Sequence, residues 1–309
     1  MPPKAKNTAQ NKALFIGHTY IDVTISTDVI PTGDDKAVAH DYDFGIGGNA
    51  TVAAITSAKL GVKTVLQASI ANDLLGEVVE RKYKSYGIEL YRRDIDKTSL
   101  SLVLPNDGKR AILRARNTDY TDTYPEVPLK GVKVLHLDGH QPKAALEYAK
   151  RCREAGILTS LDGGGMRENT LELLKYIDVA VVAVRFCDQL EKTPEETIRW
   201  LQEEYNTPVA AVTMGERGMI YALNGGPIKK IKALKIPKNK ILDTTGAGDI
   251  YHGAYVVSYM MDSNKTWEEH FVFARAASSL SIQRMGTEAS IPTLEEIQAF
   301  LEQPENCKV

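Results

Sequence analysis

One seven-residue segment combines the residue types that phosphoryl transfer requires. Residues 243–249 read Asp-Thr-Thr-Gly-Ala-Gly-Asp and lead into an apolar stretch with helical character. The glycines let the backbone turn tightly, and the helix start adds unpaired N–H groups and a positive dipole end, so the segment forms an anion site. Asp249 could accept the proton of an attacking hydroxyl while these amides stabilise the transferring phosphoryl group. The structural alternative is a helix cap beside a plain glycine turn.

Most of the chain alternates apolar strands with helices. Strands are expected over residues 63–70, 132–137, 157–161, 179–184 and 209–213, and helices over residues 49–60, 73–86, 142–155, 170–176 and 194–205. Gly61, Gly87 and Gly156 supply helix stop signals. Apolar strands between helices indicate a mostly parallel sheet covered on both faces. We therefore predict a doubly wound α/β fold, with residues 13–303 as a single domain and residues 1–12 as a frayed tail.

Two segments show strand-like alternation without a helical partner. They lie within residues 20–45 and 94–118, and the second contains the hairpin signal Asn106-Asp107-Gly108. Such isolated β segments cannot bury both faces alone. We expect them to form a small sheet beside the main domain, which serves as a lid or as the contact of a homodimer.

The composition excludes several classes of protein. The chain of 309 residues carries 38 basic and 40 acidic side chains, a formal charge of -2, which gives no general attraction to nucleic acid or an anionic membrane. The cysteines at 152, 187 and 307 include no Cys-x-x-Cys pair, so neither a disulfide framework nor a zinc site is indicated. Neither a signal-peptide core nor a membrane-spanning run is recognisable, so a cytoplasmic location is the expectation.

Two other nucleotide-binding motifs do not fit. The sequence contains no Gly-x-x-x-x-Gly-Lys-Ser/Thr run, which argues against a P-loop kinase. The segment Gly45-Ile-Gly47-Gly48 lacks the third glycine of a dinucleotide-binding fingerprint.

Two segments together resemble the ribokinase-like (PfkB) carbohydrate kinases. Residues 243–249 match their signature Asp-Thr-x-Gly-Ala-Gly-Asp, and Gly47-Gly48-Asn49 with the small-residue helix after it is similar to their Gly-Gly-Asn turn. The resemblance extends from Leu14 to about Leu301. It implies that Asp249 is the base and that an anion hole is formed by the amides of Gly246, Ala247 and Gly248.

The same resemblance implies where the substrates bind. An Asp after the first strand, here Asp22, would hold sugar hydroxyls together with Gly47, Gly48 and Asn49; the alternative for Asp22 is a turn cap. The segment 213–218 looks like the family's nucleotide loop, so ATP would contact Thr213, Gly215, Gly218 and Thr245.

The metal sites are less well matched. Many members of the family bind a monovalent cation such as K⁺, which would here fall to Asp243, Thr245, Arg284, Gly286 and Ser290. The family's Asn-x-x-Glu, which helps to place Mg²⁺, is replaced by Ala183-Val-Arg185-Phe. Mg²⁺ would then be held mainly by phosphates and water, and Arg185 could offset phosphate charge or be structural.

The lid segments are expected to select the sugar. Lys36 lies in the first and Arg114 in the second, where strand alternation puts Arg116 on the same face. These side chains could bind an anionic group, or they could protect an edge strand. Residues 33–42 and the turn at 161–164 look similar to sulfofructose kinases, and His140 lies near a strand end. A fructose-, ribose- or sulfosugar-like acceptor is the interpretation; a nucleoside kinase and a non-catalytic sugar-binding regulator remain alternatives.

Overall fold

The computed structural model describes residues 11–106, 109–121 and 123–307. Its main feature is a nine-stranded sheet in the order β13-β12-β11-β10-β9-β8-β1-β4-β5. From β11 to β5 all neighbouring strands run parallel, while β12 and β13 are antiparallel. The strands span Lys12–Gly17 (β1), Lys63–Ala71 (β4), Glu89–Ile95 (β5), Val132–Leu137 (β8), Leu158–Gly163 (β9), Val179–Ala183 (β10), Val209–Thr213 (β11), Met219–Leu223 (β12) and Lys229–Ile231 (β13).

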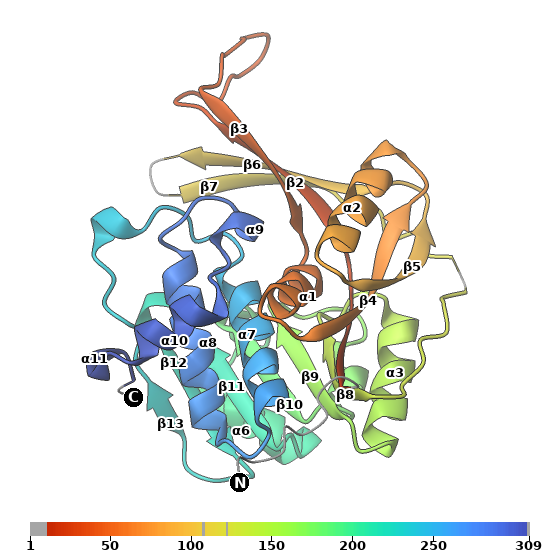
Figure 1. Cartoon of the computed structure of the whole chain (residues 1–309), viewed down its shortest axis with the longest axis vertical. Coiled ribbons are helices and arrows are strands. Elements are labelled where there is room, and N and C mark those ends of the chain that lie inside the picture. The colour runs from red at the N-terminus through yellow and green to blue at the C-terminus, as the bar shows by residue number, and fades with distance from the viewer. Residues whose placement is uncertain (1–10, 107–108, 122, 308–309) are drawn as a thin grey trace, which may run out of the picture.

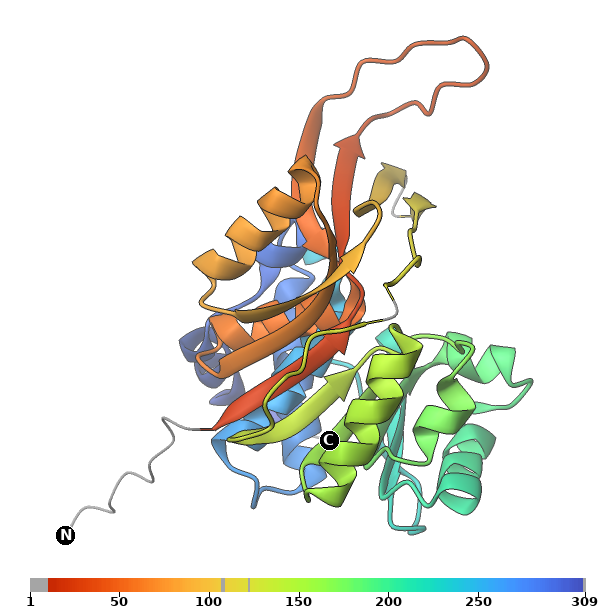
Figure 2. The same cartoon turned by 90° about the vertical axis from the view of Figure 1, so that its right-hand side faces the viewer.

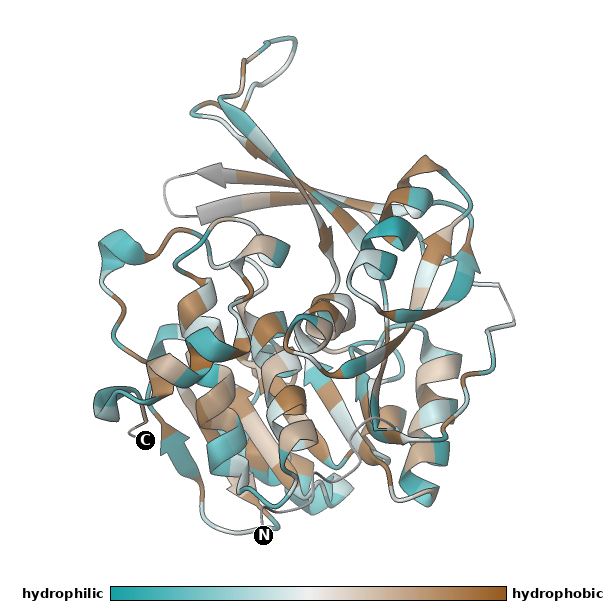
Figure 3. Ribbon diagram, in the orientation of Figure 1, coloured by the Kyte–Doolittle hydropathy of each residue, from teal (hydrophilic) through white to brown (hydrophobic). Residues whose placement is uncertain are grey.

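Helices cover both faces of this sheet (Figures 1 and 2). One face packs against α1 (Asn49–Lys59), α2 (Leu74–Ser85), α7 (Ala247–Met261), α8 (Trp267–Ser281) and α10 (Leu294–Leu301). The other packs against α3 (Pro142–Glu154), α4 (Thr170–Leu174), α5 (Val184–Gln189) and α6 (Pro194–Tyr205). The short helices α9 (Thr287–Ser290) and α11 (Pro304–Cys307) follow near the C-terminus. Apolar residues concentrate between these layers (Figure 3), which confirms the predicted doubly wound fold.

Local sequence signals account for the helix boundaries. The helices α6, α8 and α10 each begin with a capping box, in which a threonine and the glutamate three residues later satisfy each other's backbone N–H groups. Asp73 caps α2 by accepting from the Gly76 amide at 2.7 Å. Two details differ from expectation. The strand predicted to end at Val184 ends at Ala183, because α5 begins at Val184. Residue 12, expected in the tail, is already the first residue of β1, and the Lys12 ammonium pairs with Glu89 at 2.7 Å.

A second, four-stranded sheet forms the predicted lid. Its order is β3-β2-β6-β7, with β2 at Tyr20–Ser26, β3 at Asp41–Gly47, β6 at Ser99–Asn106 and β7 at Lys109–Ala115. The pairs β2–β3 and β6–β7 are antiparallel, but β2 and β6 run parallel. The expected hairpin is present, although its Asp107-Gly108 turn lies outside the described residues. The ribbon of β2 and β3 projects well beyond the main body (Figures 1 and 2).

The strand order reverses direction at β1. This strand lies between β4, which follows it on one side, and β8, from which the later strands continue on the other side. Ligands of open α/β sheets bind at such a switch point, outside the carboxyl ends of the strands. Across the described part of the chain, no helix is both long and apolar enough to cross a membrane.

Candidate active site

A cavity of about 300 Å³ lies between the lid and the carboxyl ends of the main strands. Its lining includes Asp22, Gly47, Gly48 and Asn49 on one side and Thr244, Thr245, Gly246, Gly248 and Asp249 on the other. Two turns that are about 200 residues apart in the chain therefore meet in one pocket. The sequence analysis expected both turns at one site, and the structure brings them to one pocket.

One end of the pocket is built on the start of α7. Gly246 precedes the helix with a φ of 73°, and a side chain there would bring its Cβ within 2.5 Å of Thr287 Cγ2. Glycine is required because this left-handed conformation and the close threonine both disfavour other residues. Asp249 lies in the first turn of the helix, where backbone N–H groups have no partner within the helix. A carboxylate and an anion site thus stand side by side.

The other end of the pocket is built on the start of α1. A Cβ at Gly47 would come within 2.1 Å of Asp22 Oδ2, so the carboxylate lies directly against the backbone of the turn. Gly48 has a φ of 109°, and Asn49 opens the helix. The Asn49 Nδ2 atom donates to Asp162 Oδ2 at 3.0 Å, which fixes the orientation of the amide.

Direct contact between α1 and α7 holds the two ends together. A Cβ at Gly253 would lie 2.5 Å from the Ala53 carbonyl oxygen, so the two helix backbones approach closely at this point. Gly253 lies one turn beyond Asp249, and Ala53 one turn beyond Asn49. The helix contact therefore fixes the spacing between the side chains that begin each helix.

Two buried aspartates support the pocket from behind. Asp138 follows β8 and accepts hydrogen bonds from the amides of His18, Ala50 and His140 at 3.2, 3.3 and 3.0 Å. Burial alone would raise the pKa of Asp138, but His140, whose Nδ1 lies 3.1 Å from Oδ1, holds it well below its usual range. Asp162 lies in β9, and burial raises its pKa. The sequence analysis did not identify Asp138 as a site residue, although its place after an apolar strand was the available signal.

The local environment makes Asp249 a stronger base than an exposed carboxylate. Burial raises its pKa well above the ordinary value, and the negative charges of Asp162, Asp22 and Asp138 raise it further, while Arg114 opposes the shift. A higher pKa strengthens the driving force for taking a proton from a sugar hydroxyl. The pocket thus carries the property that general-base catalysis requires.

The nucleotide residues predicted from the sequence are only partly gathered in the pocket. Thr245 lines it, whereas Thr213, Gly215 and Gly218 do not. These three lie at the end of β11 and in the turn to β12, on the same edge of the main sheet. Gly218 has a φ of 85°, and a Cβ there would meet the Ile231 carbonyl oxygen at 2.2 Å, so a tight turn accounts for this glycine.

The predicted cation-site residues lie on two adjoining loops. The Asp243 carboxylate accepts from the Thr245 amide at 2.8 Å and from the Gly286 amide at 3.2 Å. The Arg284 guanidinium binds both oxygens of Glu296, so this side chain points to α10 and only its backbone carbonyl is available as a ligand. The Ser290 hydroxyl donates to the Thr287 carbonyl at 2.9 Å.

The basic side chains divide into two groups. Lys36 is exposed in the segment between β2 and β3 and is not part of the pocket lining, whereas Arg114, Arg116 and Arg185 are. Arg167 also lines the pocket, and it was not singled out from the sequence because it follows a run of glycines, where nothing local indicates which way a side chain points.

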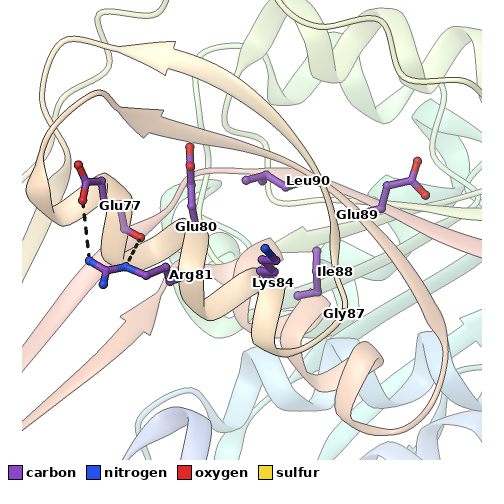
Figure 4. Close-up of a pocket in the computed structure, with 8 residues that line it drawn as sticks. All are labelled: Glu77, Glu80, Arg81, Lys84, Gly87, Ile88, Glu89 and Leu90. Atoms are coloured by element: carbon purple, nitrogen blue, oxygen red, sulfur yellow. Dashed lines mark hydrogen bonds and ion pairs between the residues drawn. The ribbon is translucent and has the colours of Figure 1, made fainter.

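A separate surface hollow between α2 and β5 contains Arg81 paired with Glu77 (Figure 4) and shares none of these residues.

Comparison with known proteins identifies the family. A profile of the pfkB family of carbohydrate kinases matches residues 10–294. The chain belongs to this family. It is 25% identical to a ribokinase from Lactococcus lactis, with 95% of this chain and 98% of the relative covered. An ATP-dependent ribose-1-phosphate kinase from Halopiger xanaduensis is 26% identical, with 94% and 98% covered.

The solved structures agree on the fold of this kinase. A ribokinase from Arabidopsis thaliana, solved in complex with ribose and ATP, superposes with a TM-score of 0.78 at 22% identity, covering 94% of this chain and 98% of that one. Both the family and the fold expected from residues 47–49 and 243–249 are thereby confirmed. This carbohydrate kinase has the lid and the paired glycine turns at the positions that the sequence indicated.

Proposed function

We propose that this carbohydrate kinase transfers the γ-phosphoryl group of ATP to a hydroxyl of a small sugar or sugar derivative, with Asp249 as the general base. The observation that carries the proposal is the position of Asp249 in the first turn of α7, beside the Gly246–Gly248 amides and in the same pocket as Asp22 and Asn49. The Arabidopsis ribokinase bound to ribose and ATP supports the same pair of substrates.

Each end of the pocket has a distinct role in this reaction. Asp22 and Asn49 bind sugar hydroxyls, because a carboxylate accepts from vicinal hydroxyls and an amide can donate or accept. Asp249 removes the proton from the attacking hydroxyl, and the amides of Gly246, Ala247 and Gly248 stabilise the charge that develops on the phosphoryl oxygens. The nucleotide lies toward Thr213, Gly215 and Gly218, at the carboxyl edge of the main sheet.

Two cations complete the proposal. Mg²⁺ arrives with ATP and neutralises the phosphates, with its coordination coming chiefly from phosphate oxygens and water. Arg185 lines the pocket, in the segment that replaces the family's Asn-x-x-Glu, and supplies a further positive charge there. The loops that Asp243 joins, which carry Thr245, Arg284, Gly286 and Ser290, form the site for a monovalent cation such as K⁺.

A homodimer through the lid belongs to the same proposal. The lid exposes the apolar side chains Tyr42, Ile112 and Leu113, with Leu113 64% exposed. Light scattering should give twice the chain mass, and Leu113→Lys should reduce it toward the monomer. A chain that stays monomeric at high concentration contradicts this part of the proposal.

The test of the kinase function is ADP release with ATP, Mg²⁺ and a panel of sugars, sugar phosphates, sulfosugars and nucleosides. Turnover with a sugar or sugar derivative that disappears in Asp249→Asn supports the proposal. Turnover confined to nucleosides identifies the chain as a nucleoside kinase. Sugar binding without turnover across the panel indicates a regulator instead.

A further inference from the structure

The lining of the pocket includes several basic side chains beside its acidic residues. Arg114 and Arg116 reach it from the end of β7, and Arg167 reaches it from the loop after β9, in the main body. His140 lines the same pocket beyond β8. Cationic side chains therefore converge on one pocket from separate segments of the chain.

We infer that the sugar accepted by this kinase carries an anionic group, a phosphate, sulfonate or carboxylate, which Arg114, Arg116 and Arg167 bind in the pocket. This inference rests on the proposed function and specifies its substrate class. A guanidinium fork matches the oxygens of such groups, and the charge-assisted hydrogen bonds are stronger than those to neutral hydroxyls.

The three arginines share Tyr20 as a neighbour. The Arg114 guanidinium carbon lies 5.2 Å from the centre of the Tyr20 ring, so the side chain is stacked on the aromatic face. Burial raises the pKa of the Tyr20 hydroxyl, while Arg116, Arg114 and Arg167 act against that shift. All three guanidinium groups thus act on one hydroxyl and line the same pocket, where one anion could contact them.

Arg167 is held by a hydrogen bond to the backbone, and no carboxylate among the described residues forms an ion pair with it. Its Nε donates to the Asp138 carbonyl oxygen at 2.8 Å, and its side chain packs against Gly139. The Asp138 carboxylate is already engaged by His140 and by backbone amides. Within the described ranges, none of Arg114, Arg116 and Arg167 forms an ion pair with a carboxylate.

The lid sheet supplies an independent sign of a bound ligand. Asp22 on β2 pairs with Ser101 on β6, and Ser101 pairs with Arg114 on β7, so these three residues form one row on the same face of the sheet. Ser101 is 1% exposed and lines the pocket, yet its Oγ has no hydrogen-bond partner among the residues that the structure describes. A buried hydroxyl without a partner is costly, and a ligand oxygen between Asp22 and Arg114 would satisfy it.

Protection of an edge strand does not explain the whole pattern. Strand β7 is the edge of the lid sheet, and charged side chains on such a strand can prevent unwanted pairing. That role involves only Arg114 and Arg116. It accounts neither for Arg167, which belongs to the main body, nor for the unsatisfied Ser101 hydroxyl.

The experiment compares matched neutral and anionic acceptors. ADP release is measured with fructose, fructose 6-phosphate and the corresponding 6-sulfonate, with ribose and ribose 1-phosphate, and with a neutral aldose and its aldonate. We expect at least one anionic acceptor to exceed its neutral partner about tenfold or more in kcat/KM, as for any interaction worth about 1.4 kcal/mol. Comparison of kcat/KM among the sugars that carry a phosphate, a sulfonate or a carboxylate shows which anionic group is bound.

The variants Arg114→Gln and Arg167→Gln separate recognition from catalysis. Each should lower the anionic-to-neutral ratio of kcat/KM by about tenfold or more, chiefly through KM for the acceptor, with KM for ATP nearly unchanged. Arg81→Gln removes one surface arginine far from the pocket and should leave the ratio as it is. Equal use of neutral and anionic acceptors in every pair, or a ratio that survives both variants, overturns the inference while leaving the kinase function intact.

Failure of the kinase function itself gives a different result. If no acceptor in the panel is turned over, calorimetry with the same pairs in the presence of a non-hydrolysable ATP analogue decides the question. If the anionic sugar of a pair binds more tightly than the neutral one, and Arg114→Gln abolishes that difference, the anion site is supported. The proposed kinase activity is then contradicted by the absence of turnover. Equal binding of both members, or binding of neither, overturns the anion site as well.

Discussion

Asn49 donates a hydrogen bond to Asp162 at 3.0 Å and thereby joins the start of α1 to strand β9. The same carboxylate is, after burial, the largest cause of the raised pKa of Asp249. Asp162 therefore acts on both ends of the pocket, since it orients the Asn49 amide and raises the pKa of Asp249, the proposed base.

Asp162→Asn should move the acid limb of the pH–rate profile to lower pH. Asp249 must be ionised to act as a base, so activity falls as the pH drops through its pKa. Removing a nearby negative charge lowers that pKa, and the enzyme should remain active at more acidic pH, although with a smaller kcat. The profile of kcat/KM checks this, and an acid limb that stays in place or moves to higher pH contradicts it. The matched control is Asp178→Asn. The Asp178 carboxylate accepts a hydrogen bond from Thr159, which lies on β9 as Asp162 does.

Asp249→Asn should lower kcat by about 10²–10⁴-fold, the usual range for losing a general base. Binding of ATP should persist because the substitution leaves the backbone amides proposed to contact the phosphates in place. Single-turnover kinetics and nucleotide titration measure the two effects separately. A variant with wild-type kcat would remove Asp249 from its role.

The same variant should also change stability in a pH-dependent manner. A carboxyl group whose pKa is raised on folding weakens the folded state as the pH rises above its unfolded pKa of about 3.9. Asp249→Asn abolishes this penalty, so its melting temperature should exceed that of the wild type more at pH 8 than at pH 4. Thermal unfolding at both pH values tests the sign, and a larger gain at pH 4 would show that the pKa is not raised.

Gly47→Ala should impair sugar binding more than it impairs folding. The new methyl group would overlap the Asp22 carboxylate, since a Cβ there lies 2.1 Å from Oδ2. Displacing Asp22 by about 1 Å can cost up to about 10²-fold in kcat/KM. Gly45→Ala is the control in the same strand, because its Cβ would have only an ordinary contact at 3.7 Å with Glu288. If both variants behave alike, Asp22 does not contact the sugar.

Glu288→Gln should destabilise the junction between the lid and the main body. The buried Glu288 carboxylate accepts from the Ile46 amide at 2.8 Å, from Tyr86 at 2.5 Å and from Lys82 at 3.1 Å. Loss of the charge weakens these bonds by about 1–3 kcal/mol in all. Urea unfolding gives the difference, with Glu77→Gln as an exposed control whose arginine contact is 3.8 Å. No loss of stability relative to that control would contradict the assigned contacts.

The extent to which the sequence predicted this structure depends on how local each signal is. Helix α6 matched its predicted bounds because Thr193 and Glu196 form a capping box within the helix itself. The parallel pairing of β2 with β6 was not predictable, because strand partners distant in the chain leave no local pattern. The glycine turns were recognisable for the opposite reason, since Gly246 and Gly48 need backbone conformations that few other residues adopt.

The site residues follow the same rule. Asp249 lies in a turn whose composition already indicates an anion site. By contrast, the position of Arg167 depends on the packing of a loop, and the unsatisfied Ser101 hydroxyl depends on the register of two strand pairs. Lys36 was chosen for its charge, but it lies at an exposed position between β2 and β3.

The close contact of Gly253 with Ala53 has a consequence for regiochemistry. It joins α1 and α7 within the main body, so the distance from Asn49 to Asp249 does not depend on the lid. In the proposed reaction, the helix pair then sets which hydroxyl is phosphorylated, while strands β2, β6 and β7 select the sugar. Exchanging the lid strands between relatives should therefore yield enzymes that accept new sugars yet modify them at the same position.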